Sequence, residues 1–277
     1  MKLKNVGYLA SALFTAGLLQ NASAQDYNWS GAGDGTTWSQ GANWVQAAPP
    51  PAGAHAVFLG TGLPTASTLP ITIGASDVVQ FSDSLFGPEW GQTLNVYGSV
   101  SAGFGLFTIG DMAGAKSTIN FYGNSSFTAG DTIALGDAWW WPGAPNVAMN
   151  LYDNSQVTTK YLWLGGHLDI YGGTVTVLNV FGAGTATGPV FAGGLDTDAT
   201  RLINIGGGKL VLAGDATAEV NDLIARGILQ GNGLVGNVNV DLLSDPGYTV
   251  ITAVPEPATL GLLALGGLAG IFARRRS

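Results

Sequence analysis

Two aspartates hold equivalent positions in a repeated pattern and are the first candidates for acid–base chemistry. Asp111 ends the stretch Thr108-Ile-Gly-Asp, and Asp137 ends the stretch Ala134-Leu-Gly-Asp. If both stretches are strands in neighbouring layers, the two carboxyl groups could come within the roughly 5–10 Å that glycoside hydrolysis requires. A Gly-Asp pair at the end of a strand also has a simpler role, because its carboxylate accepts hydrogen bonds from turn amides. We favour the turn role for both residues.

No other set of residues predicts a catalytic or metal site. Asp196 and Asp198 form an Asp-x-Asp pair that would hold calcium only weakly, and glycine-rich calcium-binding repeats are missing. His55 and His167 lie too far apart in the sequence to suggest a pair of ligands. Cysteine is absent, which excludes thiol catalysis and thiolate metal sites. We therefore expect no catalytic residue, no bound metal and no cofactor.

The charge balance excludes several classes of partner. The chain has a formal net charge of −8, with 10 basic against 18 acidic residues. Apart from the basic residues near its two ends, it retains only Lys116, Lys160, Arg201, Lys209 and Arg226. Nucleic acids and anionic membranes attract clustered cations, so neither is expected to bind the body of the protein. A polysaccharide lyase needs an Arg or Lys base beside calcium-binding acids, and so few scattered cations make that arrangement hard to assemble.

Short β-rich runs separated by turn residues must position all of these side chains. Glycine is abundant, at 43 of 277 residues, yet 46% of the chain is hydrophobic. The runs alternate with Gly, Asn, Asp and Ser, which is typical of strands and turns. We expect an all-β body without an amphipathic helix between Gln25 and Val254. The clearest runs are 69–73, 94–97, 117–122, 147–152 and 174–177.

A repeated tetrapeptide indicates how the strands are arranged. Its copies begin at Asn95, Asn120, Asn150 and Asp169, and each places an apolar residue and a tyrosine after the first position. A degraded copy begins at Asn204. Stacked repeats bury one residue of each copy in a continuous core. We therefore expect two buried rows, Val96, Phe121, Leu151 and Ile170 in one, and Ile109, Leu135 and Leu164 in the other. The asparagines and tyrosines should face outward, although asparagines at turns could stack inward.

This pattern favours a right-handed parallel β-helix, in which turns of varying length project from a regular stack. The spacing between copies is uneven, from 19 to 35 residues, so a β-sandwich with irregular hairpins is the main alternative. The stretch 228–240 resembles the closing coils of autotransporter passenger repeats.

Both ends of the chain have the features of targeting segments. Lys2 and Lys4 precede an apolar stretch and the small residues Ala22-Ser23-Ala24, which predicts a signal peptide over 1–24. At the other end, the sequence VPEPATLGLLALGGLAGIFARRRS covers 254–277. Prolines disfavour helix before the apolar segment 258–273, and the following arginines hold the C-terminus in the cytoplasm. We expect a transmembrane helix over that apolar segment.

This C-terminal segment resembles the PEP-CTERM sorting signal of Gram-negative, biofilm-forming bacteria. The resemblance covers the triplet, the apolar run and the basic cluster, which occur in that order. The residues of the sorting motif are Val254, Pro255, Glu256, Pro257, Arg274, Arg275 and Arg276. The resemblance implies cleavage near the triplet by an exosortase-type membrane protease and release or transfer to the cell surface or extracellular matrix. Before that step, we expect signal peptidase to remove the predicted signal peptide and the apolar segment to anchor the precursor transiently in the inner membrane. The alternative is a plain C-terminal anchor, which needs no such triplet.

The tryptophan-rich segment 29–58 opens the predicted body, 25–253. Trp29, Trp38 and Trp44 alternate with glycine-rich turns. The segment resembles the opening of autotransporter-associated and PEP-CTERM β-helix proteins. We expect it to cap the first coil, because a solenoid must cover its open end. A platform on which sugar rings stack is the alternative.

Three consecutive tryptophans, Trp139, Trp140 and Trp141, lie in the longest insertion between repeats. Side chains alternate faces along a strand, so at least one of the three must face solvent or pack on an outer loop. We name them as a possible contact for glycans, against the alternative of a loop folded over the body. Together these features predict an exported structural or adhesive protein that contacts exopolysaccharide. A β-helical polysaccharide lyase or hydrolase is the alternative function.

Overall fold

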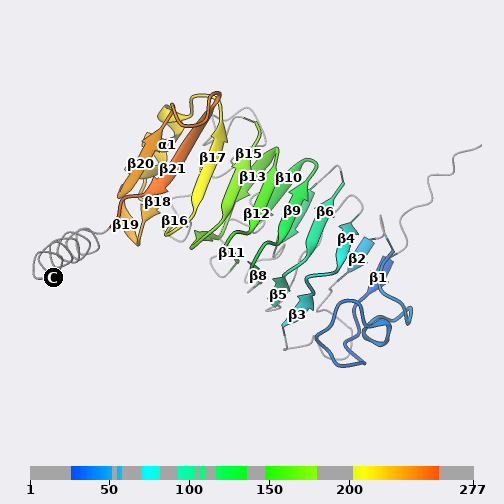
Figure 1. Cartoon of the computed structure of the whole chain (residues 1–277). Helices are drawn as coiled ribbons and strands as arrows, with labels where there is room; N and C mark the ends of the chain where they lie inside the picture. Colours follow the sequence, from blue (N-terminus) through cyan, green and yellow to red (C-terminus); the bar gives the residue numbers. More distant parts are fainter. Residues whose placement is uncertain are drawn as a thin grey trace, which may run out of the picture.

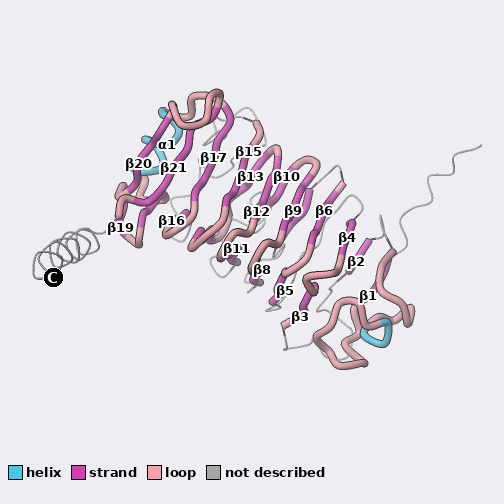
Figure 2. The backbone as a smooth tube through the Cα atoms, in the orientation of Figure 1, coloured by secondary structure: helices cyan, strands magenta, loops and turns pink. Residues whose placement is uncertain are grey.

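The computed structural model describes residues 26–51, 55–57, 70–81, 93–103, 106–109, 117–135, 147–179 and 202–255. These residues are mostly strands joined by short loops (Figure 2), which confirms the all-β prediction except for one short helix. The described residues contain no helix long and apolar enough to cross a membrane. The predicted signal peptide, the expected transmembrane helix over 258–273 and the candidates Asp111, Asp137, Asp196 and Asp198 lie outside the described residues.

Two eight-stranded sheets run side by side along an elongated body (Figure 1). In spatial order, sheet 1 consists of β3 (Ile71–Ile73), β5 (Thr93–Val96), β8 (Thr118–Phe121), β11 (Ala148–Leu151), β14 (His167–Ile170), β16 (Leu202–Ile205), β18 (Leu229–Gly231) and β19 (Leu234–Val235). Sheet 2 consists of β4 (Val78–Phe81), β6 (Ser99–Ala102), β9 (Ser126–Ala129), β12 (Gln156–Thr159), β15 (Thr174–Val177), β17 (Lys209–Ala213), β21 (Tyr248–Ala253) and β20 (Val238–Asp241).

A third, smaller sheet completes the repeat. It contains β7 (Leu106–Ile109), β10 (Thr132–Leu135) and β13 (Tyr161–Leu164), all parallel. In three successive units the chain visits sheet 1, sheet 2 and sheet 3 in that order, as β5–β6–β7, β8–β9–β10 and β11–β12–β13. Each strand pairs in parallel with the equivalent strand of the next unit. Equivalent residues of successive units therefore lie next to each other.

The two buried rows predicted from the repeats are confirmed. Val96, Phe121, Leu151 and Ile170 are neighbours in register on adjacent strands of sheet 1, and all four are fully buried. Sheet 3 aligns Ile109, Leu135 and Leu164, which are likewise buried. Strands such as β5, β11 and β14 alternate buried and half-buried residues, because successive side chains point to opposite faces. The apolar member of each tetrapeptide thus faces the core.

The N-terminal tryptophans pack together against the first strand of sheet 1. Trp29, Trp38 and Trp44 are each at least 95% buried, and Trp44 contacts both other rings edge-to-face at centroid distances of 5.0 and 4.8 Å. The backbone of Trp38 donates to the carbonyl of Thr72 in β3, which places this segment along the strand's free edge. The segment also contains β1 (Asp26–Asn28), β2 (His55–Val57) and η1 (Gly41–Asn43). A sugar-stacking platform needs exposed ring faces, and burial removes them here.

A single buried amide organises the glycine-rich turns of this segment. Asn43 is fully buried, and its Oδ1 accepts hydrogen bonds from the backbone of Gly33 and Gly35. Its Nδ2 donates to Asp34 Oδ1 at 2.7 Å and to the Thr37 carbonyl at 2.9 Å. Hydrogen bonds from the side chains of Thr37 and Asn43 hold the pKa of Asp34 well below its usual range. The predicted turns are therefore ordered around one asparagine.

The C-terminal end departs from the parallel pattern, and the prediction of a helix-free body is wrong there. Helix α1 (Thr217–Ala225) follows β17 and buries Val220 and Leu223, which lie on one face three residues apart. The final strands then pair antiparallel: β19 with β18, and β21 with both β17 and β20. The stretch 228–240, which resembles closing coils, contains β18, β19 and most of β20, and of these only β18 pairs in parallel, with β16.

Candidate functional site

Only part of the predicted site residues falls within the described structure. Trp139–Trp141 lie outside it, as do Glu256, Pro257 and Arg274–Arg276 of the sorting segment. Val254 and Pro255 are described and exposed. His167 lies half-buried on the outer face of β14, and no group of three metal-ligating side chains occurs among the described residues.

A row of side-chain amides runs along the outer face of sheet 1. Nδ2 of Asn120 donates to Oδ1 of Asn95 at 2.9 Å, and Nδ2 of Asn150 donates to Oδ1 of Asn120 at 2.8 Å. The strands hold the three residues in register, about 4.8 Å apart. The prediction that the asparagines face outward is confirmed, and they also form a ladder, which had been expected only for inward-facing ones. Each side-chain amide forms a hydrogen bond with that of the next unit, so the row links successive units.

Asp169 replaces asparagine at the next position of this row. It lies in register with Asn150 on one side and with Asn204 on the other, and Nδ2 of Asn204 donates to Asp169 Oδ1 at 3.2 Å. An ionised carboxylate accepts hydrogen bonds but donates none. Asp169 accepts one hydrogen bond of this row, from Asn204, while Asn150 donates to Asn120, so the row of hydrogen bonds is interrupted between Asp169 and Asn150.

Four tyrosines form a second row where sheet 1 turns toward sheet 2. Tyr97, Tyr122, Tyr152 and Tyr171 stack in order, with ring centroids 5.1, 4.8 and 5.2 Å apart and interplanar angles of 18°, 8° and 15°. The rings of Tyr122 and Tyr152 have a neighbour on both faces. The two end residues are the most exposed, and each has one ring face that no tyrosine of the row covers. The row thus offers its end rings and its edges to solvent.

Packing in this row alters the acidity of the phenols. Partial burial raises the pKa of Tyr122, Tyr152 and Tyr171 above the ordinary value, because it disfavours the charged phenolate. Neighbouring acidic groups add to the effect: Asp169 acts on both Tyr152 and Tyr171. The phenols therefore stay neutral hydrogen-bond donors and acceptors throughout the neutral pH range.

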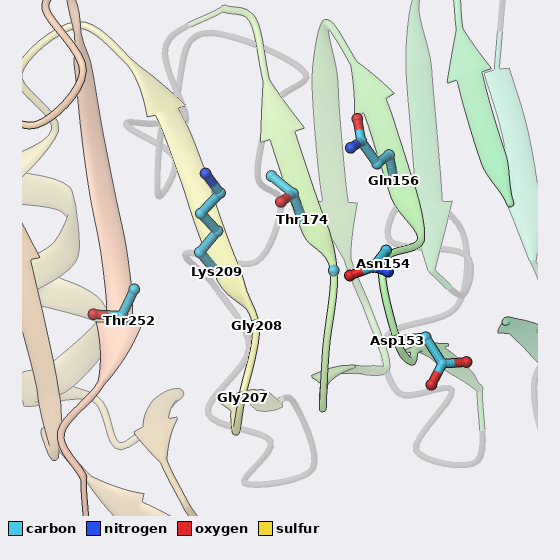
Figure 3. A pocket seen from close by; sticks show the side chains of 9 residues that line it. Asp153, Asn154, Gln156, Thr174, Gly207, Gly208, Lys209 and Thr252 are labelled. Carbon is cyan, nitrogen blue, oxygen red and sulfur yellow. The ribbon is translucent and has the colours of Figure 1, made fainter. Parts of the chain in front are cut away.

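A polar hollow of about 340 Å³ lies on the outer face of sheet 2, beside the turns from sheet 1. Gln156, Thr174, Lys209 and Thr252 line it from four neighbouring strands and are in register with one another. Figure 3 shows these four side chains following one another across β12, β15, β17 and β21. The remaining lining residues are Asp153, Asn154, Gly173, Gly207 and Gly208. The hollow therefore offers an ammonium group, amides and hydroxyls in one strip.

Glycine corners create this hollow. The corner before β12 has four residues, 152–155, whereas the corners before β15 and β17 have three each, 171–173 and 206–208. A Cβ at Gly208 would collide with Ile170 Cγ2 and with the Gly172 carbonyl oxygen, so the backbones of these corners lie close together. Because the glycines have no side chains, the surface is depressed at these corners. Sequence reasoning missed the site, although the Gly206-Gly-Gly-Lys209 stretch was a usable signal.

Lys209 is the cation of the hollow, and it is exposed. No acidic side chain in the described part of the chain forms an ion pair with it. The nearest carboxylate in the lining, that of Asp153, instead accepts a hydrogen bond from the Gly123 backbone at 2.8 Å and points away from Lys209 (Figure 3). The ammonium group is thus free to pair with a negatively charged or polar ligand.

The last described residues attach the sorting segment to the body. The Val254 N–H donates to the Asn237 carbonyl at 3.0 Å, and Asn232 Nδ2 donates to the Val254 carbonyl at 3.0 Å. Val254 follows β21, which pairs with strands on both sides. The folded body therefore reaches to the residue immediately before Pro255.

Comparisons with known proteins bear on this end of the chain. Residues 253–276 match the family model of the PEP-CTERM protein-sorting motif. The motif implies a precursor that is exported, anchored in the membrane and processed by an exosortase, a membrane protease. No curated protein and no solved structure matches the chain significantly. The comparisons thus assign the sorting segment and leave the role of the body to its own geometry.

Proposed function

We propose that this protein is a structural or adhesive component of the cell surface or extracellular matrix that contacts exopolysaccharide. The observation that carries the proposal is the polar strip formed by Gln156, Thr174, Lys209 and Thr252 on sheet 2. Hydroxyl-rich polymers are bound by such sets of amides, hydroxyls and charged groups, since each can donate to or accept from a sugar hydroxyl. Together with the sorting motif, the strip favours a partner outside the cell.

The body is, in this proposal, a right-handed parallel β-helix. The order of the strands supports it, because three successive units each add one strand to each of three sheets, parallel to the equivalent strand of the neighbouring unit. A β-sandwich of the immunoglobulin type is built from antiparallel sheets, whereas the described strands pair antiparallel only near the C-terminal end, and an isolated antiparallel bridge joins Trp29 and Trp44. Connections between parallel strands are almost always right-handed.

Processing divides the precursor into three parts. Signal peptidase removes 1–24, the body covers 25–253 with its tryptophan-rich cap in 29–58, and the sorting signal covers 254–277. The apolar segment 258–273 anchors the precursor in the inner membrane until an exosortase cleaves near the triplet. The protein then reaches the cell surface or the matrix.

Two places on the body are candidates for contact with the glycan. The strip around Lys209 is a preformed hollow with a free ammonium group, which suits a polymer with acidic as well as hydroxyl groups. Trp139–Trp141 are the second candidate, because an exposed indole face stacks well on a sugar ring. The strip is favoured because its polar groups lie in register on four neighbouring strands and line one hollow.

The alternative is a polysaccharide lyase or hydrolase of the β-helix type. Hydrolysis requires two carboxyl groups about 5–10 Å apart in a groove. Among the described residues that line the hollow, Asp153 alone is acidic, and its carboxylate accepts a hydrogen bond from the Gly123 backbone as a turn residue does. This use of Asp153 favours a binding role for the hollow.

The test uses the processed protein and immobilised exopolysaccharides, one acidic and one neutral, with and without calcium. Retention of the protein without any change in polymer length supports the proposal. Shortened chains or new unsaturated ends would instead establish the enzyme. Absence of retention on every polymer would leave a passive surface component.

Variants locate the contact. Lys209→Gln and Gln156→Ala should weaken retention on the acidic polymer several-fold, since each removes one direct contact worth about 1 kcal/mol or more. Lys209→Arg keeps the charge and should restore most of the retention. Thr128→Ala, an exposed change on β9 outside the hollow, is the control. If only a Trp139–Trp141 triple alanine variant loses binding, the tryptophans are the site instead.

A further inference from the structure

The body ends in a hydrogen-bonded clamp on the residue that precedes the sorting triplet. Both backbone groups of Val254 are engaged: its N–H donates to the Asn237 carbonyl, and its carbonyl accepts from Asn232 Nδ2, each at 3.0 Å. Asn237 Nδ2 adds a longer contact to the same carbonyl at 3.5 Å. We call Asn232, Asn237 and Val254 the end clamp.

The two asparagines of the end clamp are themselves fixed by the fold. Asn232 lies between β18 and β19, and its backbone N–H donates to the Ile205 carbonyl at 2.9 Å. Asn237 Nδ2 also donates to the Gly231 carbonyl at 3.1 Å. Asn232 has a φ of 53°, a left-handed conformation that asparagine tolerates better than most residues. Val254 is therefore held by one residue on each side of β19, and Asn232 is in turn tied to β16 of sheet 1.

Little chain separates this clamp from the membrane segment. Only Pro255, Glu256 and Pro257 lie between Val254 and the start of the apolar run at Ala258. Three residues span at most about 10 Å even when fully extended. The end of the folded body is therefore held close to the membrane surface while the precursor is anchored.

This arrangement limits how a protease can bind the triplet. A protease binds several residues of its substrate in an extended form on both sides of the scissile bond. On the N-terminal side, β21 is paired with β17 and with β20, and Val254 is clamped directly after it. The triplet's N-terminal flank becomes available only when the end clamp opens.

We propose that the end clamp controls processing of the precursor by the exosortase. In this role Asn232 and Asn237 are positioning residues: they act through Val254 and touch neither the scissile bond nor the protease. When opening and closing are fast relative to cleavage, the rate of proteolysis follows the population of the open form. The strength of the clamp then sets how fast the folded protein leaves the membrane.

The first variant to test is Asn232→Gly in the full-length precursor, expressed in a bacterium that has an exosortase. Glycine keeps the left-handed backbone and removes the amide that holds the Val254 carbonyl. A pulse-chase experiment follows conversion of precursor to processed protein. Loss of one hydrogen bond should raise the conversion rate about two- to tenfold. Asn239→Ala, an exposed change on the adjacent strand β20, should leave the rate unchanged.

A second variant separates access from stability. Inserting Gly-Ser-Gly-Ser between Val254 and Pro255 lengthens the exposed flank without touching the clamp. The insertion should raise the conversion rate, and adding Asn232→Gly to it should have little further effect. In the purified protein, Asn232→Gly should speed amide hydrogen exchange at Val254 while exchange at Ile203 in β16 stays slow.

Three results would overturn the proposal. The first is that the Asn232→Gly precursor is converted at the wild-type rate or more slowly, although its Val254 amide exchanges faster. The second is an insertion variant that is processed at the wild-type rate. The third is a wild-type precursor that stays uncleaved in the presence of the exosortase, which would also remove the sorting role itself. Failure of glycan binding, in contrast, has no bearing on any of these measurements.

Discussion

Nδ2 of Asn150 donates to Oδ1 of Asn120 at 2.8 Å, across two neighbouring strands of sheet 1. Asn120 in turn donates to Asn95, so its amide is both a donor and an acceptor within the row. A residue in the middle of such a row satisfies two neighbours at once. The row therefore depends most on its central member.

Asn120→Ala should lower the free energy of unfolding by about 1–3 kcal/mol. Asn120 is only 9% exposed, and its removal leaves the amides of Asn95 and Asn150 without their partner. Urea unfolding followed by circular dichroism measures the change. Asn221→Ala, on the exposed side of α1, is the matched control and should stay within about 0.5 kcal/mol of wild type. Equal effects of the two changes would show that the row does not contribute to stability.

Asn43→Ala should destabilise the tryptophan-rich segment by about 2 kcal/mol or more. The fully buried amide bonds to the backbone of two glycines, to Asp34 and to the Thr37 carbonyl, and all of these groups lose a partner together. Tryptophan fluorescence and near-ultraviolet circular dichroism report on the change, because Trp44 follows directly. The exposed change Ser39→Ala should leave both signals intact. An unchanged tryptophan environment in Asn43→Ala would contradict the organising role of this amide.

The tyrosine row should make the protein sensitive to alkaline pH. Burial raises the pKa of Tyr122, Tyr152 and Tyr171, so the unfolded chain, with tyrosine pKa values of about 10, loses phenol protons first as pH rises. These tyrosines should therefore leave the free energy of unfolding unchanged below about pH 10 and lower it above that pH. Denaturant unfolding across that range, with tyrosinate absorbance, measures the slope. Tyr152→Phe should reduce it, and an unchanged slope would contradict the assignment.

Gly231→Ala should open the C-terminal end of the body. An added Cβ would collide with the Asn237 carbonyl oxygen, which also accepts the Val254 N–H. Hydrogen exchange should become fast over β18, β19 and the end of β21, while β8 and β11 keep their protection. Gly233→Ala is the control: its Cβ meets nothing within 4 Å, so it carries only the strain of a φ of 76°. Similar exchange in both variants would show that the close approach is unimportant.

The repeated tetrapeptide made the core predictable. Buried positions such as Phe121 and Leu151 follow from the apolar member of each copy, because neighbouring copies must align for the core to be continuous. The outward asparagines and tyrosines follow from the same alternation. Whether the asparagines bond to one another depends on strand spacing and rotamers, which the tetrapeptide alone does not specify.

Other features depend on contacts that the repeated tetrapeptide does not specify. Helix α1 buries only Val220 and Leu223, too few for a clear helical period in nine residues. The antiparallel course of β21 depends on the turn at Asp245-Pro-Gly247 and on free edges at β17 and β20, which become visible only in the fold. The hollow arises from the difference between a four-residue corner and two glycine corners of three residues. The effect of these corner lengths on the surface can be predicted only once the strands are aligned.

The central position of β21 in sheet 2 has a mechanical consequence. β21 lies between β17 and β20 and runs antiparallel to both, and its C-terminal end leads directly into the sorting motif. Tension between the membrane and the body therefore pulls on β21 along its own length. Such a force loads the hydrogen bonds to both neighbours at the same time, in shear, and does not peel them apart one by one. An anchored precursor of this kind should withstand drag on its body before the strand slips.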